Sequence, residues 1–154
     1  MELILEIQYA TAADNLPTEA ELQQWAIAAI GNRRSQAELV IRVVDEPEIA
    51  ALNQQYRNKP GATNVLSFPF QAPPPVESNL LGDLVICAPV VSKQAAEQEK
   101  REPAHWAHMV VHGILHLLGY DHKQSAEAAE MENMEIEILA QLGFPDPYLT
   151  NGTS

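Results

Sequence analysis

The chain has 154 residues with an ordinary hydrophobic fraction of 46%, which predicts one globular domain over residues 1–154 with its own core. A formal net charge of -12 argues against nucleic-acid binding through a broad basic surface, and the single cysteine, Cys87, excludes an internal disulfide. The first residues carry acids within an apolar run, unlike a signal peptide, and no apolar stretch approaches the roughly 20 residues that cross a membrane. We therefore expect a cytoplasmic protein without membrane contact.

Local patterns predict three strands and two helices in the first half of the chain. In chain order they are a strand at Leu3–Ile7, a helix from Thr18 to Gly31, a strand at Leu39–Val44, a helix that begins at Asp45 with Pro47 in its first turn, and a strand at Val65–Phe70. Thr18 and Glu21 have the spacing of a capping box, and Gly31 suits a helix end. Asp45 is expected to cap its helix, and Pro69 favours a sheet edge or a strand end.

The second half predicts one further strand and three helices. These are the strand Leu80–Ile86 and helices at about Val90–Lys100, Pro103–Leu118 and Ser125–Leu142. A stiff proline-rich loop at 72–75 precedes this strand, and a loose tail is expected at about 150–154. The fold class is therefore α+β, with a central mixed sheet of about four strands and about five helices, arranged as an α+β layer or as a three-layer sandwich.

A run of histidines near the end of the fourth predicted helix carries the chemistry. His112, His116 and His122 follow the pattern H-x-x-x-H-x-x-G-x-x-H, in which Gly119 supplies the bend that returns the third histidine. Residues four apart on a helix lie about 6 Å apart along the axis, which lets both rings reach one ion at about 2.0–2.1 Å. The spacing predicts a metal site at the end of the helix and in the following turn.

Three imidazole ligands favour zinc, with one ion per chain, over magnesium or calcium, which prefer oxygen. Three protein ligands leave a fourth position for water, and zinc lowers the pKa of such a water to about 7. His108, one turn before His112, either closes that position, lies behind the ligands or contacts substrate. Asp121 either orients a ligand histidine from behind or is only a turn acid.

Gly113 stands where metalloproteases with this ligand spacing carry a glutamate as general base, which argues against peptide hydrolysis. Phosphodiester cleavage instead needs a cation beside the metal, and Arg57 offers a planar fork that matches phosphate. Arg57 and Lys59 lie in a window between Glu48 and Glu77 that contains no acid, so this segment could meet an anionic substrate. The alternatives are a surface salt bridge for Arg57 and a chance lack of acids in a loop.

Two blocks of sequence resemble the YbeY family of bacterial ribosome-associated metallo-endoribonucleases. They are Tyr56–Phe70 (YRNKPGATNVLSFPF) and His108–His122 (HMVVHGILHLLGYDH), and Leu81–Ile86 between them also fits. The resemblance implies a single-strand-specific, zinc-dependent endoribonuclease that acts in 16S ribosomal RNA 3′-end maturation and late-stage 70S ribosome quality control. It also implies an α+β fold with a central sheet, and zinc at His112, His116 and His122.

With this resemblance, we expect Arg57 and His112 to be catalytic, and Lys59, Asn64 and His108 to contact substrate. The implied partners are ribosomal RNA and the ribosome or its small subunit. A ribosomal or GTPase protein would supply targeting, because the acidic chain has few groups that could bind single-stranded RNA alone. Two alternatives stay open: a non-catalytic ribosome-assembly factor whose structural metal is closed by His108, and a metzincin-like metallopeptidase.

Overall fold

The computed structural model describes residues 2–70, 78–120 and 125–149. Its strands are β1 (Glu2–Ala10), β2 (Gln36–Val44), β3 (Val65–Pro69) and β4 (Leu80–Cys87), and its helices are α1 (Glu19–Ile30), α2 (Glu46–Arg57), α3 (Ala88–Glu97), α4 (Glu102–Leu117) and α5 (Ser125–Gln141). One sheet has the order β1-β2-β4-β3, in which β1, β2 and β4 run parallel and β3 pairs antiparallel with β4. The predicted α+β class, mixed four-stranded sheet and five helices are confirmed.

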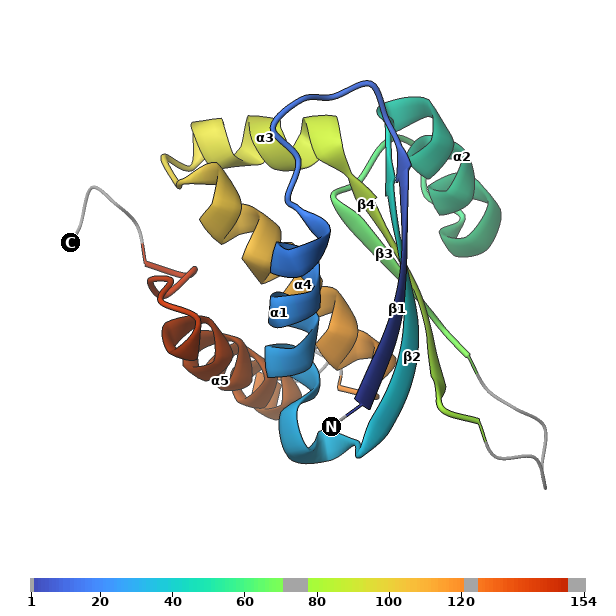
Figure 1. The fold of residues 1–154 in the computed structure, drawn as a ribbon. Coiled ribbons are helices and arrows are strands. Elements are labelled where there is room, and N and C mark those ends of the chain that lie inside the picture. Colours follow the sequence, from blue (N-terminus) through green and yellow to red (C-terminus); the bar gives the residue numbers. More distant parts are fainter. Residues whose placement is uncertain (1, 71–77, 121–124, 150–154) are drawn as a thin grey trace.

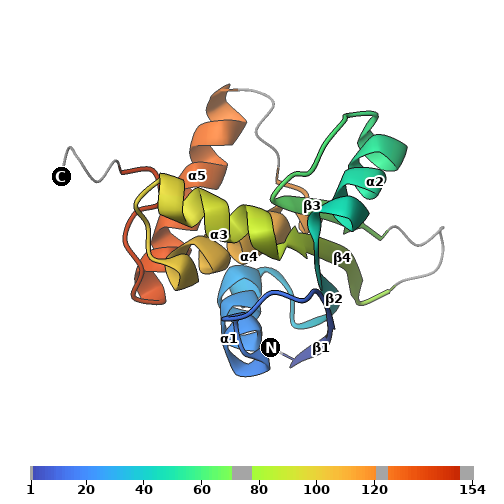
Figure 2. The ribbon, with the colours of Figure 1, turned by 90° about the horizontal axis from the view of Figure 1, so that it is seen from above.

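Helices lie on both faces of the sheet, with α1, α3, α4 and α5 on one face and α2 on the other (Figure 1, and from above in Figure 2). Helix α4 is the centre of the larger layer, since it packs on β3 and β4 and also contacts α1, α3 and α5. Its Trp106 is buried in the main core, while Ile49 of α2 and Leu66 of β3 belong to a smaller core on the opposite face. The histidine helix is therefore packed between the sheet and three other helices.

The local sequence explains why these elements form. Along β2, every second side chain is buried, as expected for a strand whose one face lies under helices: Ala37, Leu39, Ile41 and Val43. The predicted capping box is present, because the Glu21 amide donates to Thr18 Oγ1 at 3.1 Å and the Thr18 amide donates to Glu21 Oε1 at 3.0 Å. The predicted edge position of Pro69 is also confirmed, since β3 is the last strand of the sheet.

Two sequence predictions about helix ends are right in outline and wrong in detail. Asp45 stands at the cap position of α2, but its carboxylate does not cap the helix; it accepts hydrogen bonds from Thr11 Oγ1 and, at 3.4 Å, from the Ala12 amide. Asp45 therefore ties the end of β1 to the start of α2. The helix predicted at about Val90–Lys100 is α3, which begins earlier, directly after β4, and ends earlier, before Glu99. The φ of 54° at Glu99 cannot continue a helix. The predicted loop at 72–75 and tail at 150–154 lie outside the described residues.

The β3–β4 pair depends on a glycine. Gly82 pairs with Pro69 and has a φ of 141°, and a Cβ at this position would lie 2.2 Å from the Phe68 carbonyl oxygen. No side chain fits there without moving the backbone of β3, so this close approach requires glycine. The pair matters for the site because α4 packs directly on both strands.

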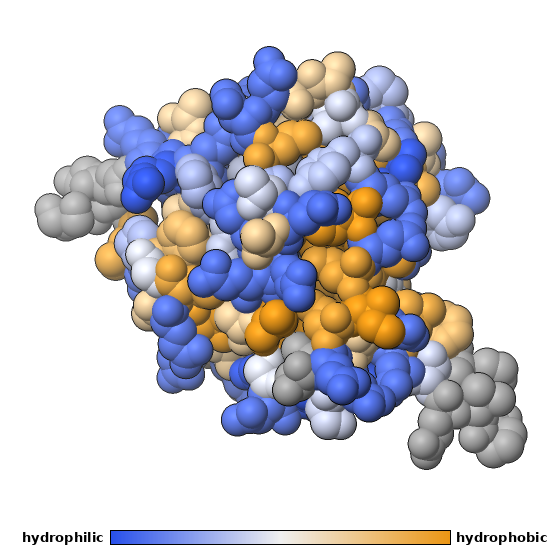
Figure 3. Space-filling model, in the orientation of Figure 1, coloured by the Kyte–Doolittle hydropathy of each residue, from blue (hydrophilic) through white to orange (hydrophobic). Residues whose placement is uncertain are grey.

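The surface in the view of Figure 3 is mostly hydrophilic, with apolar side chains gathered over the neighbouring region of α1 and β1. Ile4 of β1 and Ile27 of α1 are exposed apolar residues of these elements, at 66% and 39% of their accessible surface. In the described part of the chain, none of the helices has the length and apolar character required to cross a membrane.

Candidate metal centre

Helix α4 brings four histidines into one row. Pro103 occupies the first turn, where its missing amide hydrogen costs nothing, and the helix then runs unbroken to Leu117. His105 and His108 are buried, whereas His112 and His116 are half-buried. The ring centroids of His112 and His116 are 4.7 Å apart, as expected for side chains one turn apart that face the same way. The two predicted ligands on the helix therefore do lie together.

Glu135 of α5 completes the cluster from the opposite side. It is 1% exposed, and its Oε1 lies 2.5 Å from His108 Nε2 while its Oε2 lies 3.4 Å from His112 Nδ1. Tyr148 also donates its hydroxyl to Glu135 Oε1, at 2.9 Å. One buried carboxylate is thus shared by two histidines of α4 and a tyrosine from the segment after α5.

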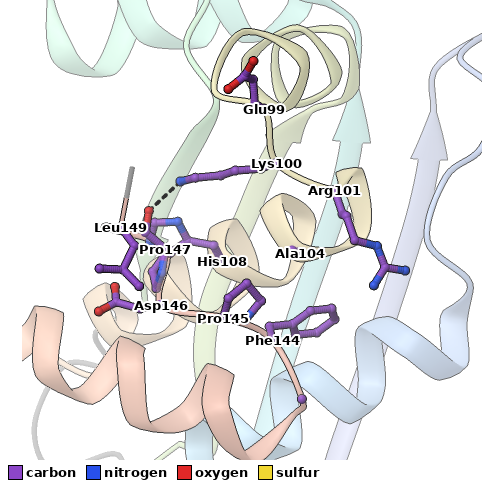
Figure 4. A pocket seen from close by; sticks show the side chains of 11 residues that line it. Glu99, Lys100, Arg101, Ala104, His108, Phe144, Pro145, Asp146, Pro147 and Leu149 are labelled. Atoms are coloured by element: carbon purple, nitrogen blue, oxygen red, sulfur yellow. Dashed lines mark hydrogen bonds between the residues drawn. The ribbon is translucent and has the colours of Figure 1, made fainter. Parts of the chain in front are cut away.

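The segment after α5, residues 142–149, covers this cluster and is called the closing segment below. Lys100 donates from Nζ to the Pro147 carbonyl at 2.6 Å, and the Tyr148 amide donates to Asp146 Oδ1 at 2.8 Å. Figure 4 shows Lys100, His108, Pro147 and Leu149 around a hollow of about 400 Å³. The closing segment is therefore anchored both to the turn before α4 and to the buried carboxylate.

The electrostatics of the cluster favour a charged Glu135. Burial alone would raise the pKa of this carboxyl, but hydrogen bonds from His108 and His112 outweigh burial and lower the pKa to about 2. Burial, followed by the nearby His108 and Lys100, lowers the pKa of His105 from 6.5 to about 4. Burial and the negative charge of Glu135 raise the pKa of Tyr148, whose hydroxyl therefore stays protonated and donates. At neutral pH Glu135 is therefore a carboxylate and His105 is neutral.

The described residues fit a metal ion. Donor atoms of His108, His112 and Glu135 all lie within 4.8 Å of one another, and imidazole with carboxylate is a ligand set that zinc and related ions accept. Two ligands at about 2.1 Å from a tetrahedral ion lie about 3.4 Å apart. The 3.4 Å between His112 and Glu135 matches that separation, whereas the 2.5 Å between His108 and Glu135 is that of a direct hydrogen bond. In its contact with His108, the Glu135 carboxylate therefore orients the histidine row.

The structure gives a packing reason for a glycine at position 113 that the sequence did not reveal. A Cβ at this position would lie 2.6 Å from Leu84 Cδ2 and 3.4 Å from Ser67 Oγ, so position 113 faces β3 and β4. Ser67 Oγ also donates to the Gly113 carbonyl at 3.2 Å. A glutamate here would be directed into the core rather than toward Glu135. Close packing between α4 and the sheet is therefore a further reason for glycine at this position, beside the predicted lack of a general base.

The other predicted site residues lie in three places. Arg57 and Lys59 are exposed at the end of α2 and just beyond it, and within the described residues neither side chain makes an ion pair or a hydrogen bond. A surface salt bridge for Arg57, the alternative raised by the sequence, is thus not present among those residues. Asn64 is half-buried before β3 and donates to Gln94 Oε1 at 3.2 Å, beside the histidine helix. Asp121 and His122 lie outside the described residues.

Sequence reasoning missed Glu135, and one signal could have revealed it. Glu135 belongs to an acid-rich segment in which the other glutamates are exposed or half-buried. However, it follows Met131 by four residues and precedes Ile138 by three, so it lies on the buried stripe of α5. An acid on an apolar stripe needs a partner, and the row of histidines on the neighbouring helix offers one.

Fold and site together define the class: an α+β protein whose central helix carries a row of histidines backed by a buried carboxylate that could hold a metal ion. A family model described as Endoribonuclease YbeY matches residues 6–143. Endoribonuclease YbeY of Nitrosococcus oceani is 54% identical over 150 residues, which cover 96% of this chain and 98% of that protein. The chain therefore belongs to the endoribonuclease YbeY family, and with it to the hydrolases.

A solved structure supports the fold independently. The solution structure of TM1509 from Thermotoga maritima aligns with a TM-score of 0.58, covering 93% of this chain and 99% of that one at 24% identity. At that identity the likeness concerns the fold alone.

Proposed function

We propose that residues 1–154 form one endoribonuclease domain that cleaves single-stranded RNA and depends on one bound zinc ion. The observation that carries this proposal is the 54% identity to an endoribonuclease YbeY over nearly the whole of both chains. The clustering of His112 and His116 on α4 supports it, because it provides two imidazole donors, and the carboxylate of Glu135 on the neighbouring helix α5 orients one of them.

In this proposal His112, His116 and His122 hold the zinc ion, and Asp121 supports a ligand from behind. A bound zinc ion supplies Lewis acidity, which polarises a phosphoryl oxygen and lowers the pKa of water. Glu135 accepts from His112 Nδ1, which leaves the other ring nitrogen of His112 for the metal and fixes the orientation of the ring. His108 is occupied by Glu135 through Nε2, so we assign it a supporting role that leaves one coordination position open to substrate or water.

Arg57 is proposed to hold the phosphate that is attacked, with Lys59 nearby. Its side chain is exposed at the end of α2 and, among the described residues, is not engaged in an ion pair, so its guanidinium is available to an anion. A planar guanidinium can bind two phosphate oxygens and steady the charge that develops on them. Asn64 lies just before β3, where it donates to Gln94 beside the histidine helix, and we assign it a contact with the RNA chain.

The proposed substrate is ribosomal RNA, with action at the 3′ end of 16S RNA and in late-stage 70S quality control in the cytoplasm. A net charge of -12 supports a role for the ribosome, or for a ribosomal or GTPase protein, in bringing enzyme and RNA together. A non-catalytic assembly factor with a closed structural metal is the second candidate. The hydrogen bond that already occupies His108 Nε2 counts against a closed shell that uses this atom.

The experiment compares wild type with His116→Ala, Arg57→Ala and the control Arg34→Ala on single-stranded and duplex RNA, with zinc content measured for each protein. We expect His116→Ala to lose zinc and cleavage together. Arg57→Ala should keep its zinc and cleave about 100-fold more slowly, as found when one charge-stabilising group is removed. Equal cleavage by all four proteins would identify a contaminating nuclease and refute the proposal, and full zinc binding without cleavage by wild type would favour the assembly factor.

A further inference from the structure

A second hollow adjoins the candidate metal centre. It has a volume of about 490 Å³ and lies between α3, α4 and the segment after α5. It shares Lys100, His108, Pro147 and Leu149 with the hollow in Figure 4, so the two lie on either side of the closing segment. Its volume is in the range of about 300–1,000 Å³ that small organic ligands occupy. Asn64 and His108 line it, but the function proposed above gives no role to Gln94, Gln98 or Tyr148, which also line it.

Gln94 presents a fixed hydrogen-bond donor to this hollow. Its Oε1 accepts from Asn64 Nδ2 at 3.2 Å and lies 2.9 Å from His105 Nε2, which therefore carries the proton that points to it. Because this oxygen takes part in two hydrogen bonds, a 180° rotation of the Gln94 amide would break both of them. Its Nε2 has no acceptor among the described residues, so two N–H groups are held ready for a ligand.

Tyr148 supplies an aromatic wall to the same hollow. Its hydroxyl is bound to Glu135, and its ring meets the ring of His108 edge-on at a centroid distance of 5.4 Å. Even so, the residue is 44% exposed. A ring that is anchored at its hydroxyl and open elsewhere is suited to stacking on a flat ligand.

We propose that this hollow is a subsite for one unpaired nucleobase of the RNA, in which the Gln94 amide donates to a carbonyl or ring-nitrogen acceptor of the base and Tyr148 stacks on it. The proposal rests on the function proposed above and adds a source of sequence preference. Proteins that read single-stranded RNA stack splayed bases on aromatic side chains and bind their edges with polar side chains. His108 lines the hollow and is joined to the metal centre through Glu135, so a base held here lies beside the site of cleavage.

The chemistry of the walls favours a base over a phosphate. The one lysine of the hollow, Lys100, already donates to the Pro147 carbonyl at 2.6 Å, and burial lowers its pKa. Three side-chain amides line the space: Asn64, Gln94 and Gln98. The other polar side chains are already hydrogen-bonded within the protein, His105 to Gln94 and both His108 and Tyr148 to Glu135. Uncharged donors match the acceptor edges of a base, whereas phosphate binding favours arginine or lysine.

The test uses the full-length, zinc-loaded protein and the four ribonucleosides, with binding followed by NMR chemical shifts of the amides and side chains. We expect binding in the millimolar range, with the largest shifts at Gln94 and Tyr148, and preference for one or two of the four bases. Gln94→Glu keeps an acceptor for Asn64 and His105 but removes the donor, and should weaken binding about tenfold or more. Gln23→Met, a change on the exposed side of α1, should bind as wild type does.

A second pair of variants separates stacking from the bond to Glu135. Tyr148→Phe keeps the ring and should retain binding, whereas Tyr148→Leu should lose it. Ribose 5-phosphate serves as a probe without a base and should leave Gln94 unaffected. Nucleoside shifts that map elsewhere, equal binding by Gln94→Glu, or equal binding of ribose 5-phosphate would overturn the subsite.

Cleavage of an RNA with randomised positions gives an independent readout. Wild type should prefer certain bases at one position beside the cut, and Gln94→Glu should change that preference. Nucleoside binding at Gln94 by a protein that cleaves no RNA would reject the proposed enzyme while leaving the base subsite intact. Active cleavage without any base preference, together with no nucleoside binding, would reject the subsite alone.

Discussion

The buried carboxylate of Glu135 should contribute strongly to the stability of the fold, even without metal. The replacement Glu135→Gln keeps the shape and an acceptor for Tyr148 but removes the negative charge that His108 and His112 approach. The difference between an ordinary carboxyl pKa of 4.5 and the value of about 2 in the fold corresponds to about 3 kcal/mol. A hydrogen bond to a charged group typically contributes about 1.5–3 kcal/mol, which agrees with this figure.

The assay is urea denaturation in the presence of a chelator, so that metal binding does not contribute. At pH 7 we expect Glu135→Gln to lose about 3 kcal/mol of unfolding free energy relative to wild type. Because the folded pKa of Glu135 is lowered, its contribution is complete above pH 4.5 and falls as the pH drops toward about 2. At about pH 3 the difference between the two proteins should therefore shrink to less than half.

The control is Glu137→Gln, which removes an exposed acid from the same helix. It should change stability by no more than about 0.5 kcal/mol at either pH, as is usual for surface positions. A loss below about 1 kcal/mol for Glu135→Gln, or the same loss for both variants, would show that the carboxylate is not paired as described. A difference that grows at low pH would reverse the sign and refute the charged state assigned to Glu135.

Three further predictions concern packing and protonation. Gly82 has a φ of 141°, and Gly82→Ala forces a Cβ into the backbone of β3, so thermal unfolding should show a loss of at least about 2 kcal/mol of stability. Gly143→Ala, whose Cβ would have nothing within 4 Å, should lose only about 1 kcal/mol. Gly113→Ala places its Cβ against the buried Leu84 and should lower the melting temperature despite the better helix propensity of alanine; an increase would show that α4 can move from the sheet. The pKa of His105 is lowered to about 4 in the folded protein, so the unfolded chain takes up a proton at this residue first as the pH falls. Wild type should therefore lose about 2 kcal/mol of unfolding free energy between pH 7 and pH 5, a loss that His105→Gln should not show.

Local patterns in the sequence were sufficient to predict the elements, because each signal depends on near neighbours. The capping box of Thr18 and Glu21 is a contact within one turn, and the alternation along β2 reflects one buried face. Asp45 shows the limit of such reasoning. Its carboxylate had a local use as a helix cap, but Thr11, distant in the sequence, competes for it once β1 lies alongside. Strand order and pairing of this kind follow from tertiary contacts that no local pattern contains.

The candidate site was predicted in part for the same reason. His112 and His116 are one turn apart on a single helix, so their proximity follows from helix geometry alone. Glu135 comes from another helix, and only the packing of α4 against α5 brings the two elements together. Gly113 was noticed from the sequence, but the direction in which it faces depends on how α4 is rotated on the sheet. Sequence spacing thus predicts which site residues lie together on one helix, whereas their partners on other elements follow only from how the elements pack.

The strong acidity of the chain leads to a last prediction about RNA binding. Among the acids of α5, Glu135 is buried and accepts hydrogen bonds from His108 and His112, so its carboxylate is not presented to RNA at the surface. The segment with Arg57 and Lys59 contains no acid between Glu48 and Glu77, and the hollow beside α4 offers amides and an aromatic ring. Binding should therefore depend on few ionic contacts, and two cations predict a slope of log K against log salt of about −1.4 for single strands. Fluorescence anisotropy over a salt series measures this slope, Lys59→Ala should reduce it by about half, and a slope steeper than about −3 would reveal a basic surface that this reasoning excludes.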